Sequence, residues 1–279
     1  MQFVDFLKRA WYYFVKEYGR MIQMKKVLLV SIDGMRPDGA LSCGNDFVKY
    51  LMQNGTYTLD AKTVMPSITL PCHLSLFYSV SPDRHGTLNN TYVVPVRPVM
   101  GLFQSIERAG GRCAMFYGWD TMRTVCDFTS LMHSYYINAF ADDNTDSLLT
   151  DEALKIMDKY RPDFVYLYLV ETDDKGGHGV GWMSQPYLDC ISNAFDCVKR
   201  IYDKYGDEYD ILITADHGGH DRTHGTDRQE DMTIPMFFIG ENFEKGKELH
   251  NVRILDLAPT ITKIMGVQAD REWEGNSLI

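Results

Sequence analysis

The sequence predicts an α/β fold with a mostly parallel central sheet and helices on both faces. Two observations support this prediction: apolar runs alternate with helical stretches, and the runs are apolar throughout. The first run, "KVLLVSI" at residues 26–32, has the composition of a strand that is buried on both faces. A repeated strand–helix–strand order places parallel strands in one sheet and packs the connecting helices over it.

The same pattern continues along the chain. Further strands are predicted at 112–118, 163–170, 210–215 and 234–240. Helices are predicted at 45–54, 98–110, 147–160, 184–205 and 254–265. The first of these helices should end at Gly55, since glycine often terminates helices.

The domain organisation follows from the two ends of this pattern. Residues 1–23 have apolar and aromatic side chains at helical spacing and predict an amphipathic helix. We expect this helix to pack on the rest of the chain; a subunit contact in a homo-oligomer and a membrane-surface anchor are the alternatives. Residues 24–279 are predicted to form a single domain. Within it, the segment 119–146 lacks clear periodicity and predicts either part of a lid or pocket wall or a plain surface excursion.

Composition narrows the function classes and the cellular location. The formal net charge is −10, which argues against a nucleic-acid polymer as partner because such polymers need a basic surface. No apolar run has the length of a transmembrane segment, and charged residues interrupt any signal-peptide core. The six cysteines have irregular spacing and no CxxC pair, which is typical of reduced thiols in a cytoplasmic protein.

Acidic and histidine residues follow three of the predicted strands. Ligands in such sheets bind beyond the carboxyl ends of the strands, and carboxylate with imidazole is a ligand set for zinc, manganese or iron. Together with a threonine at 69, the candidates exceed what one tetrahedral ion can use, so two divalent ions are expected. Two ions about 4 Å apart can hold the attacking and leaving oxygens of a displacement at phosphorus. The seven candidates are Asp33, Thr69, Asp174, His178, Asp216, His217 and His224.

Several motifs in order resemble a known family. "VSIDGMRPD", "TLPCH", "SPDRHG", "DKGGHGVG", "TADHGGH" and the following "HGT" are similar to the motifs of the alkaline phosphatase superfamily, and most of all to its type I phosphodiesterase / nucleotide pyrophosphatase family. The resemblance runs from Lys25 to the C-terminus and implies an alkaline phosphatase-like fold. It also implies two divalent ions, for which we expect zinc, with manganese as the alternative.

The resemblance also implies a role for each candidate ligand. One ion would be held by Asp33, Thr69, Asp216 and His217, and the other by Asp174, His178 and His224. The family pattern places the aspartate four residues before the histidine, which favours Asp174, and Asp173 stays open as the alternative. His220 lacks the glycine that follows His224, so we expect it beside the site or on the surface.

Thr69 has two interpretations. A threonine before a helix is commonly an N-cap, whereas the resemblance implies a nucleophile that forms a phosphothreonine intermediate. The predicted function is therefore a two-metal hydrolase of small phosphate esters, with phosphodiesters or nucleotide pyrophosphates favoured. A phosphomonoesterase or phosphomutase is the alternative on the same metal core. A non-catalytic binding protein with the same fold is the alternative of another class.

Other polar residues near these motifs have simpler predicted roles. Cys72 stands where the nucleotide-cleaving family members usually have an asparagine that helps to hold a phosphoryl oxygen, and a thiol is a weak donor. Packing is the expected role of Cys72. His73 and His85 are expected to be structural, and Asn89 and Asn90 to make turn hydrogen bonds after the "HG" dipeptide.

Overall fold

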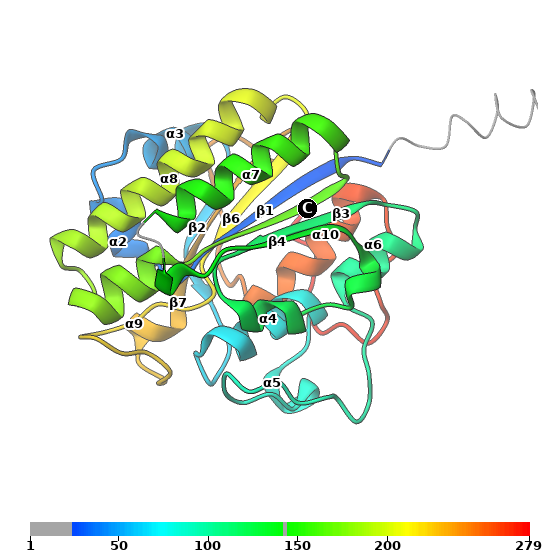
Figure 1. The fold of residues 1–279 in the computed structure, drawn as a ribbon, viewed down its shortest axis with the longest axis horizontal. Helices are drawn as coiled ribbons and strands as arrows, with labels where there is room; N and C mark the ends of the chain where they lie inside the picture. The colour runs from blue at the N-terminus through cyan, green and yellow to red at the C-terminus, as the bar shows by residue number, and fades with distance from the viewer. Residues whose placement is uncertain (1–23, 142–143) are drawn as a thin grey trace, which may run out of the picture.

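A computed structural model describes residues 24–141 and 144–279. The amphipathic helix predicted for residues 1–23 lies outside the described residues, so its packing and any subunit contact stay predictions. The described chain forms an eight-stranded sheet in the order β4-β3-β5-β1-β6-β7-β2-β8, with helices on both faces (Figure 1). The predicted fold class is confirmed.

The strands predicted from apolar runs are all present. In the described part of the chain, β7 alone runs against the other strands, because it pairs antiparallel with both β6 and β2. The sheet is therefore mostly parallel, as predicted. The strands are β1 (Lys26–Ile32), β2 (Thr56–Lys62), β3 (Cys113–Tyr117), β4 (Leu131–Tyr136), β5 (Phe164–Leu169), β6 (Tyr209–Thr214), β7 (Thr233–Ile239) and β8 (Lys247–Glu248).

Helices form a layer on each side of this sheet. Figure 1 shows α2, α3, α7 and α8 on one face, and α4, α6 and α10 on the other. The α-helices are α2 (Pro37–Ser42), α3 (Asp46–Asn54), α4 (Thr69–Tyr78), α5 (Pro82–His85), α6 (Leu102–Arg108), α7 (Thr145–Tyr160), α8 (Gln185–Tyr205), α9 (Gln229–Met232) and α10 (Leu257–Met265). Short 3-10 helices span Asp120–Thr124, Phe128–Ser130, Ala139–Ala141 and Ile254–Asp256, and a π-helical turn spans Thr172–His178.

Local sequence explains several of the helix ends. The side chain of Asn45 accepts a hydrogen bond from the backbone N–H of Phe47 and so caps the start of α3. The helix ends before Gly55, as predicted, and a Cβ at that position would lie 2.2 Å from the carbonyl oxygen of Phe238. Glycine is therefore required there by close contact with β7. Ser184 caps α8 in the same way as Asn45 caps α3.

Three strands have no counterpart in the sequence prediction, namely β2, β4 and β8. The strand β4 lies within the segment 119–146 and pairs in parallel with β3 at one edge of the sheet. Its residues alternate between exposed and half-buried, so it lacks the continuous apolar run that marks the central strands. The segment thus forms a sheet edge, and a role as a lid stays a prediction.

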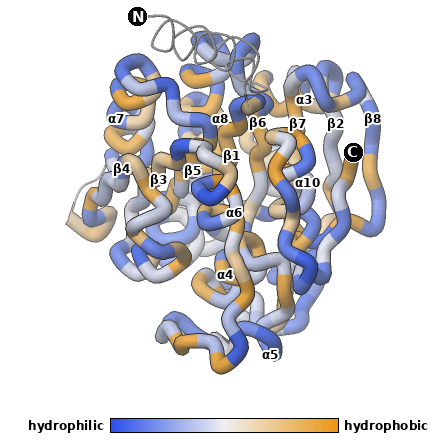
Figure 2. The backbone as a smooth tube through the Cα atoms, turned by 90° about the vertical axis from the view of Figure 1, so that its right-hand side faces the viewer, coloured by the Kyte–Doolittle hydropathy of each residue, from blue (hydrophilic) through white to orange (hydrophobic). Residues whose placement is uncertain are grey.

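The central strands set the position of the functional residues. Every residue of β5 and β6 is buried, and Figure 2 shows hydrophobic colour along β6 and β7. Because β1 lies between β5 and β6 and runs parallel to both, the carboxyl ends of the three strands meet at one edge. The polar residues that follow these strands are therefore brought together. Among the described residues, we find no helix with the length and hydropathy of a membrane span.

Candidate metal centre

The first group of candidate ligands lies where β1 and β6 end. Asp33 follows β1, and Asp216 and His217 follow β6. The Nε2 atom of His217 lies 3.4 Å from Asp33 Oδ1 and 3.4 Å from Asp216 Oδ2. All three side chains are buried. Their ligand atoms are close enough together to hold one metal ion.

Thr69 faces this first group. It is the first residue of α4, and the N-cap position belongs to Ile68, so the N-cap interpretation of Thr69 does not match the structure. The Oγ1 atom of Thr69 instead lies 3.2 Å from Nε2 of His217, and the residue is 5% exposed. The hydroxyl is thus held at the edge of the carboxylate–imidazole cluster.

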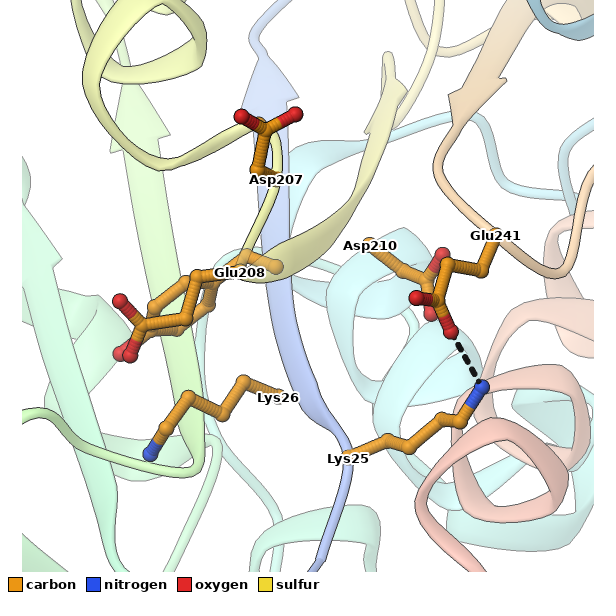
Figure 3. Close-up of a pocket in the computed structure, with 8 residues that line it drawn as sticks. Lys25, Lys26, Asp207, Glu208, Asp210 and Glu241 are labelled. Carbon is orange, nitrogen blue, oxygen red and sulfur yellow. Dashed lines mark hydrogen bonds and ion pairs between the residues drawn. The ribbon is translucent and has the colours of Figure 1, made fainter.

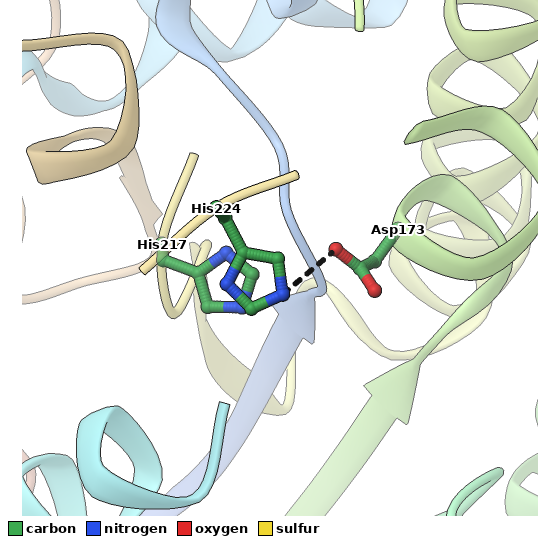
Figure 4. A group of neighbouring side chains, drawn as sticks. All are labelled: Asp173, His217 and His224. Carbon is green, nitrogen blue, oxygen red and sulfur yellow. Dashed lines mark ion pairs between the residues drawn. The ribbon is translucent and has the colours of Figure 1, made fainter. Parts of the chain in front are cut away.

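The second group combines a residue of the π-helical turn after β5 with two residues of the loop between β6 and β7. Asp173, His217 and His224 lie together (Figure 4). The Oδ1 atom of Asp173 is 3.9 Å from Nε2 of His224, and its Oδ2 atom is 3.5 Å from Nε2 of His178. The rings of His217 and His224 are stacked with centroids 3.9 Å apart. The two groups share His217 and form one continuous cluster.

The position of Asp173 favours the alternative that the sequence left open beside Asp174. An aspartate four residues before a histidine suits an α-helix, but residues Thr172–His178 form a π-helical turn. Such a turn accommodates one more residue than an α-helical turn, so the aspartate that faces His178 comes five residues before it. Neither Asp174 nor His178 belongs to the two groups of clustered ligand atoms, and His178 adjoins the second group through Asp173.

Two glycines allow this turn to pack closely. A Cβ atom at Gly177 would lie 2.6 Å from the ring of Trp182, and one at Gly176 would lie 2.8 Å from the Cα of Tyr187. The Trp182 ring also contacts the rings of His178 and His224. The "GG" dipeptide is therefore needed for the close packing that holds the second group.

Replacing Asp173 and Asp174 separately tests which of the two aspartates binds an ion. We expect Asp173→Asn to lose one of two bound ions per chain, because a neutral amide is a much weaker ligand for a divalent ion than a carboxylate. Asp174→Asn, the matched control on the next residue, should keep both ions. Metal content per chain by mass spectrometry, with the melting temperature of each variant, measures the difference. Loss of an ion from Asp174→Asn alone would restore the sequence-based assignment.

Hydrogen bonds to backbone carbonyls orient the three histidines. The Nδ1 atoms of His217, His224 and His178 lie 2.8 Å, 2.9 Å and 3.0 Å from the carbonyl oxygens of Gly218, Ser67 and Arg222, respectively. A carbonyl only accepts hydrogen bonds, so each Nδ1 carries the proton and each Nε2 offers its lone pair. All three Nε2 atoms lie near carboxylate oxygens of the cluster. This is the arrangement in which histidine binds metal ions.

Unpartnered carboxylate oxygens show that the cluster fits positive ions. Asp33 Oδ1, Asp173 Oδ1 and Asp216 Oδ2 are buried without a hydrogen-bond partner. Burial and the charge of Asp216 raise the pKa of Asp33 well above its ordinary value, and burial raises the pKa of Asp173 to about 6. Burial and the neighbouring His217 lower the pKa of His224 to about 3, so this ring is neutral at neutral pH. Bound divalent ions would supply positive charge that compensates the negative charge of these buried carboxylates.

Three further histidines, His73, His85 and His220, have structural partners. His73 is buried, and its Nδ1 atom lies 2.8 Å from the carbonyl oxygen of Thr69. The Nδ1 atom of His85 accepts a hydrogen bond from the backbone N–H of Thr87, and its Nε2 atom lies 3.1 Å from Ser75 Oγ. Both agree with the predicted structural roles. His220 pairs with the buried Asp231 at 2.7 Å and thereby supports the loop that carries His217 and His224.

Asn90 is a residue near Thr69 that the sequence analysis did not assign to the site. Asn89 accepts a hydrogen bond from the backbone N–H of Thr91, as predicted for a turn. Asn90 does not: its Oδ1 atom accepts from the N–H of Leu70 at 3.1 Å, at the start of α4. The predicted turn bond is therefore wrong for Asn90, whose side chain contacts the backbone of the residue after Thr69. The two residues are far apart in sequence, so only folding brings them together.

Cys72 does not take the place of the family's asparagine. Its side chain is buried, and it receives a hydrogen bond from Thr63 Oγ1 at 3.1 Å. Burial raises the pKa of the Cys72 thiol far above its ordinary value. Cys72 thus packs in the core, as predicted.

A charged pocket at the other end of the sheet is separate from this centre. It lies at the amino ends of β1 and β6 and is lined by Lys25, Lys26, Asp207, Glu208, Asp210 and Glu241 among others (Figure 3). Lys25 pairs with Glu241 at 2.9 Å, and Asp210 accepts hydrogen bonds from Asn242. These charges have partners within the protein, so the pocket adds nothing to the metal centre.

Two family models match the chain. A model for type I phosphodiesterase / nucleotide pyrophosphatase matches residues 27–109, and a model for the metalloenzyme superfamily matches residues 114–269. Their boundary falls between α6 and β3. The first match contains Asp33 and Thr69, and the second contains the other candidate ligands. The two matches together thus cover the whole cluster.

Two known proteins of related families match parts of this chain. A 2,3-bisphosphoglycerate-independent phosphoglycerate mutase of Clostridioides difficile is 28% identical over 138 residues, which cover 47% of this chain and 26% of the mutase. The rat ectonucleotide pyrophosphatase/phosphodiesterase family member 1 is 24% identical over 217 residues, covering 68% of this chain and 24% of that protein. This chain thus matches about a quarter of the length of each of these relatives.

A solved structure shows the shared fold. The human ectonucleotide pyrophosphatase / phosphodiesterase 5 has a TM-score of 0.76 at 15% identity, over 91% of this chain and 97% of that one. The metalloenzyme model alone matches more than half of the 279 residues. This protein therefore belongs to the metalloenzymes of the alkaline phosphatase superfamily, and its first part carries the type I phosphodiesterase / nucleotide pyrophosphatase pattern.

Proposed function

We propose that this protein is a two-metal hydrolase of phosphate esters with Thr69 as its nucleophile. One observation carries the proposal: the Thr69 hydroxyl lies 3.2 Å from Nε2 of His217, in contact with the group formed by His217, Asp33 and Asp216. Helix capping does not explain a buried threonine hydroxyl beside unpartnered carboxylate oxygens. It is well placed for attack on a phosphorus atom bound at the cluster.

Two divalent ions fit the residues of the cluster. Asp33, Thr69, Asp216 and His217 would hold one ion, and Asp173, His178 and His224 the other. We propose zinc, with manganese as the alternative, because most of these ligands are not carboxylates. When bound, such ions supply positive charge that makes a hydroxyl more acidic and neutralises phosphoryl oxygens.

The proposed reaction consists of two successive displacements at phosphorus. The Thr69 hydroxyl loses its proton to water, its Oγ1 atom forms a bond to phosphorus, and the bond from phosphorus to the leaving oxygen breaks. The leaving oxygen takes a proton from water and departs. A water molecule then attacks the phosphorus atom, the bond between phosphorus and Oγ1 breaks, and Oγ1 takes up a proton from water. The product is a phosphate monoester from a diester and phosphate from a monoester. These two displacements exchange one difficult hydrolysis for two easier steps.

Two features at the start of α4 favour binding of a negatively charged substrate at Thr69. The N-terminus of a helix carries partial positive charge and unpaired N–H groups, and Thr69 is the first residue of α4. Asn90 accepts from the N–H of Leu70, which leaves its own amide N–H groups to donate to a phosphoryl oxygen. The protein can thus orient the phosphoryl group before attack.

The comparisons leave two substrate types within this proposal. Similarity to the rat phosphodiesterase family member covers more of this chain than similarity to the mutase does, so we favour phosphodiesters or nucleotide pyrophosphates. The mutase relative supports a phosphomonoesterase or phosphomutase as the second candidate. A non-catalytic binding protein is disfavoured because the ligand residues and Thr69 are all present in one cluster.

A substrate panel tests the proposed function. The purified protein, loaded with zinc or with manganese, is assayed with bis-4-nitrophenyl phosphate, 4-nitrophenyl phosphate and a dinucleotide pyrophosphate. We expect the diester and the pyrophosphate to be cleaved with higher kcat/KM than the monoester. A reversed order would support the second candidate. Absence of turnover on every substrate with two ions bound would favour the binding protein.

A further inference from the structure

Tyr168 contacts one of the proposed metal ligands from inside the sheet. Its side chain is fully buried on β5, and its hydroxyl donates a hydrogen bond to Asp33 Oδ2. The other oxygen, Asp33 Oδ1, has no hydrogen-bond partner and lies 3.4 Å from Nε2 of His217. The two oxygens of Asp33 therefore have different surroundings: one faces the protein interior, and the other faces the metal centre.

Strand pairing fixes this contact. In the parallel pair of β1 and β5, Ser31 lies opposite Tyr168 and Ile32 opposite Leu169. The backbone N–H of Asp33 continues the ladder by donating to the carbonyl oxygen of Leu169 at 2.9 Å. The backbone of Asp33 is thus held next to β5. This pairing places the Asp33 side chain within hydrogen-bond distance of the Tyr168 hydroxyl.

The ring of Tyr168 is held in place from the other side by His73. The two rings meet edge to face with centroids 5.0 Å apart, and His73 is fixed by its bond to the carbonyl oxygen of Thr69. His73 also lies 3.5 Å from Asp216 Oδ2. The same buried layer beneath the centre therefore contacts Asp33, Asp216 and the backbone of Thr69.

We propose that Tyr168 is a positioning residue that holds Asp33 Oδ2 so that Asp33 binds the first ion through Oδ1 alone. The inference rests on the proposed function, since it needs an ion at Asp33, Asp216 and His217. An oxygen that already accepts a strong hydrogen bond is a poor second ligand, so the carboxylate cannot turn to bind the ion with both oxygens. The coordination position that the second oxygen of Asp33 would otherwise occupy is then available to the substrate or to Thr69.

The same strand offers a matched control. Tyr166 lies two residues before Tyr168, so the two side chains point to the same face of the sheet. Both are fully buried, but no hydrogen bond joins the hydroxyl of Tyr166 to Asp33. Changing either tyrosine to phenylalanine removes one buried hydroxyl from β5. Only Tyr168→Phe also removes a hydrogen bond to Asp33.

The test measures zinc affinity directly. Wild type, Tyr168→Phe and Tyr166→Phe are titrated with zinc against a chromophoric chelator, and the melting temperature of each apo protein is recorded. We expect Tyr168→Phe to bind one of the two ions about ten- to a hundredfold more weakly, the usual effect of losing a residue that orients a ligand. The other ion should bind as in wild type. Tyr166→Phe should keep both affinities.

A second pair of variants separates the hydrogen bond from packing. Incorporating 4-aminophenylalanine at position 168 retains a donor, whereas 4-methylphenylalanine has a similar size and none. We expect the amino variant to bind zinc like wild type and the methyl variant to resemble Tyr168→Phe. This comparison also serves if Tyr168→Phe does not fold.

The outcomes distinguish this inference from the proposed function. Wild-type protein that binds no zinc would refute the proposed metal centre itself. Wild-type protein that binds two ions while Tyr168→Phe keeps both affinities would refute only the role of Tyr168. Equal losses in Tyr168→Phe and Tyr166→Phe, or in the amino and methyl variants, would reduce Tyr168 to a packing residue and also overturn the inference.

Discussion

Changing Thr69 to alanine is expected to reduce turnover by several orders of magnitude while the fold and most of the metal binding persist. The variant loses both the covalent route and a pre-positioned attacking atom, which together contribute most of such a rate enhancement. Asp33, Asp216 and His217 remain to hold the first ion. Because Ile68 and not Thr69 occupies the N-cap position of α4, the loss of about 1 kcal/mol expected for a missing cap should not occur.

Thr69→Ser is the matched variant for this experiment. It keeps the hydroxyl and removes only a methyl group, so a measurable rate should remain. Turnover, metal content and melting temperature are measured for both variants, and acid-quenched wild-type protein is examined by mass spectrometry for phosphate on the peptide that contains Thr69. An alanine variant with full activity would refute the proposed mechanism, whatever its melting temperature.

Removing the metal ions is expected to abolish activity and to lower the stability of the protein. Without ions, the buried oxygens of Asp33, Asp173 and Asp216 face one another with no compensating charge. Ions that bind only the folded state stabilise it by about 4 kcal/mol when present at roughly a thousand times their dissociation constant. Dialysis against a chelator should therefore lower the melting temperature as well as the rate.

Adding metal back provides the control for the chelator. About two equivalents of zinc or manganese per chain should restore both the rate and the melting temperature, as expected from the two ligand groups and the ligand preferences of these ions. Magnesium, which prefers oxygen ligands, should restore less. Full activity after exhaustive chelation, verified by metal analysis, would exclude a role for metal ions in catalysis.

The sequence by itself determined the central strands and the place of two candidate ligands at the sheet edge. The strands β1, β5 and β6 are buried on both faces, so their sequences must be apolar throughout, and such runs are visible without a structure. The residues directly after β1 and β6 then have to lie at the same sheet edge. Asp33 and Asp216 could be assigned to the site for this reason, and His217 follows Asp216 directly.

Only the tertiary structure decided which residues farther from the strand ends face the centre. Asp173 rather than Asp174 faces His178 because a π-helical turn changes the spacing on one side of the helix, and a count of residues cannot show that change. Asn90 reaches α4 from an exposed loop, and Tyr168 reaches Asp33 through the pairing of β5 with β1. These contacts join residues distant in sequence, so they depend on how strands and loops pack and not on local sequence.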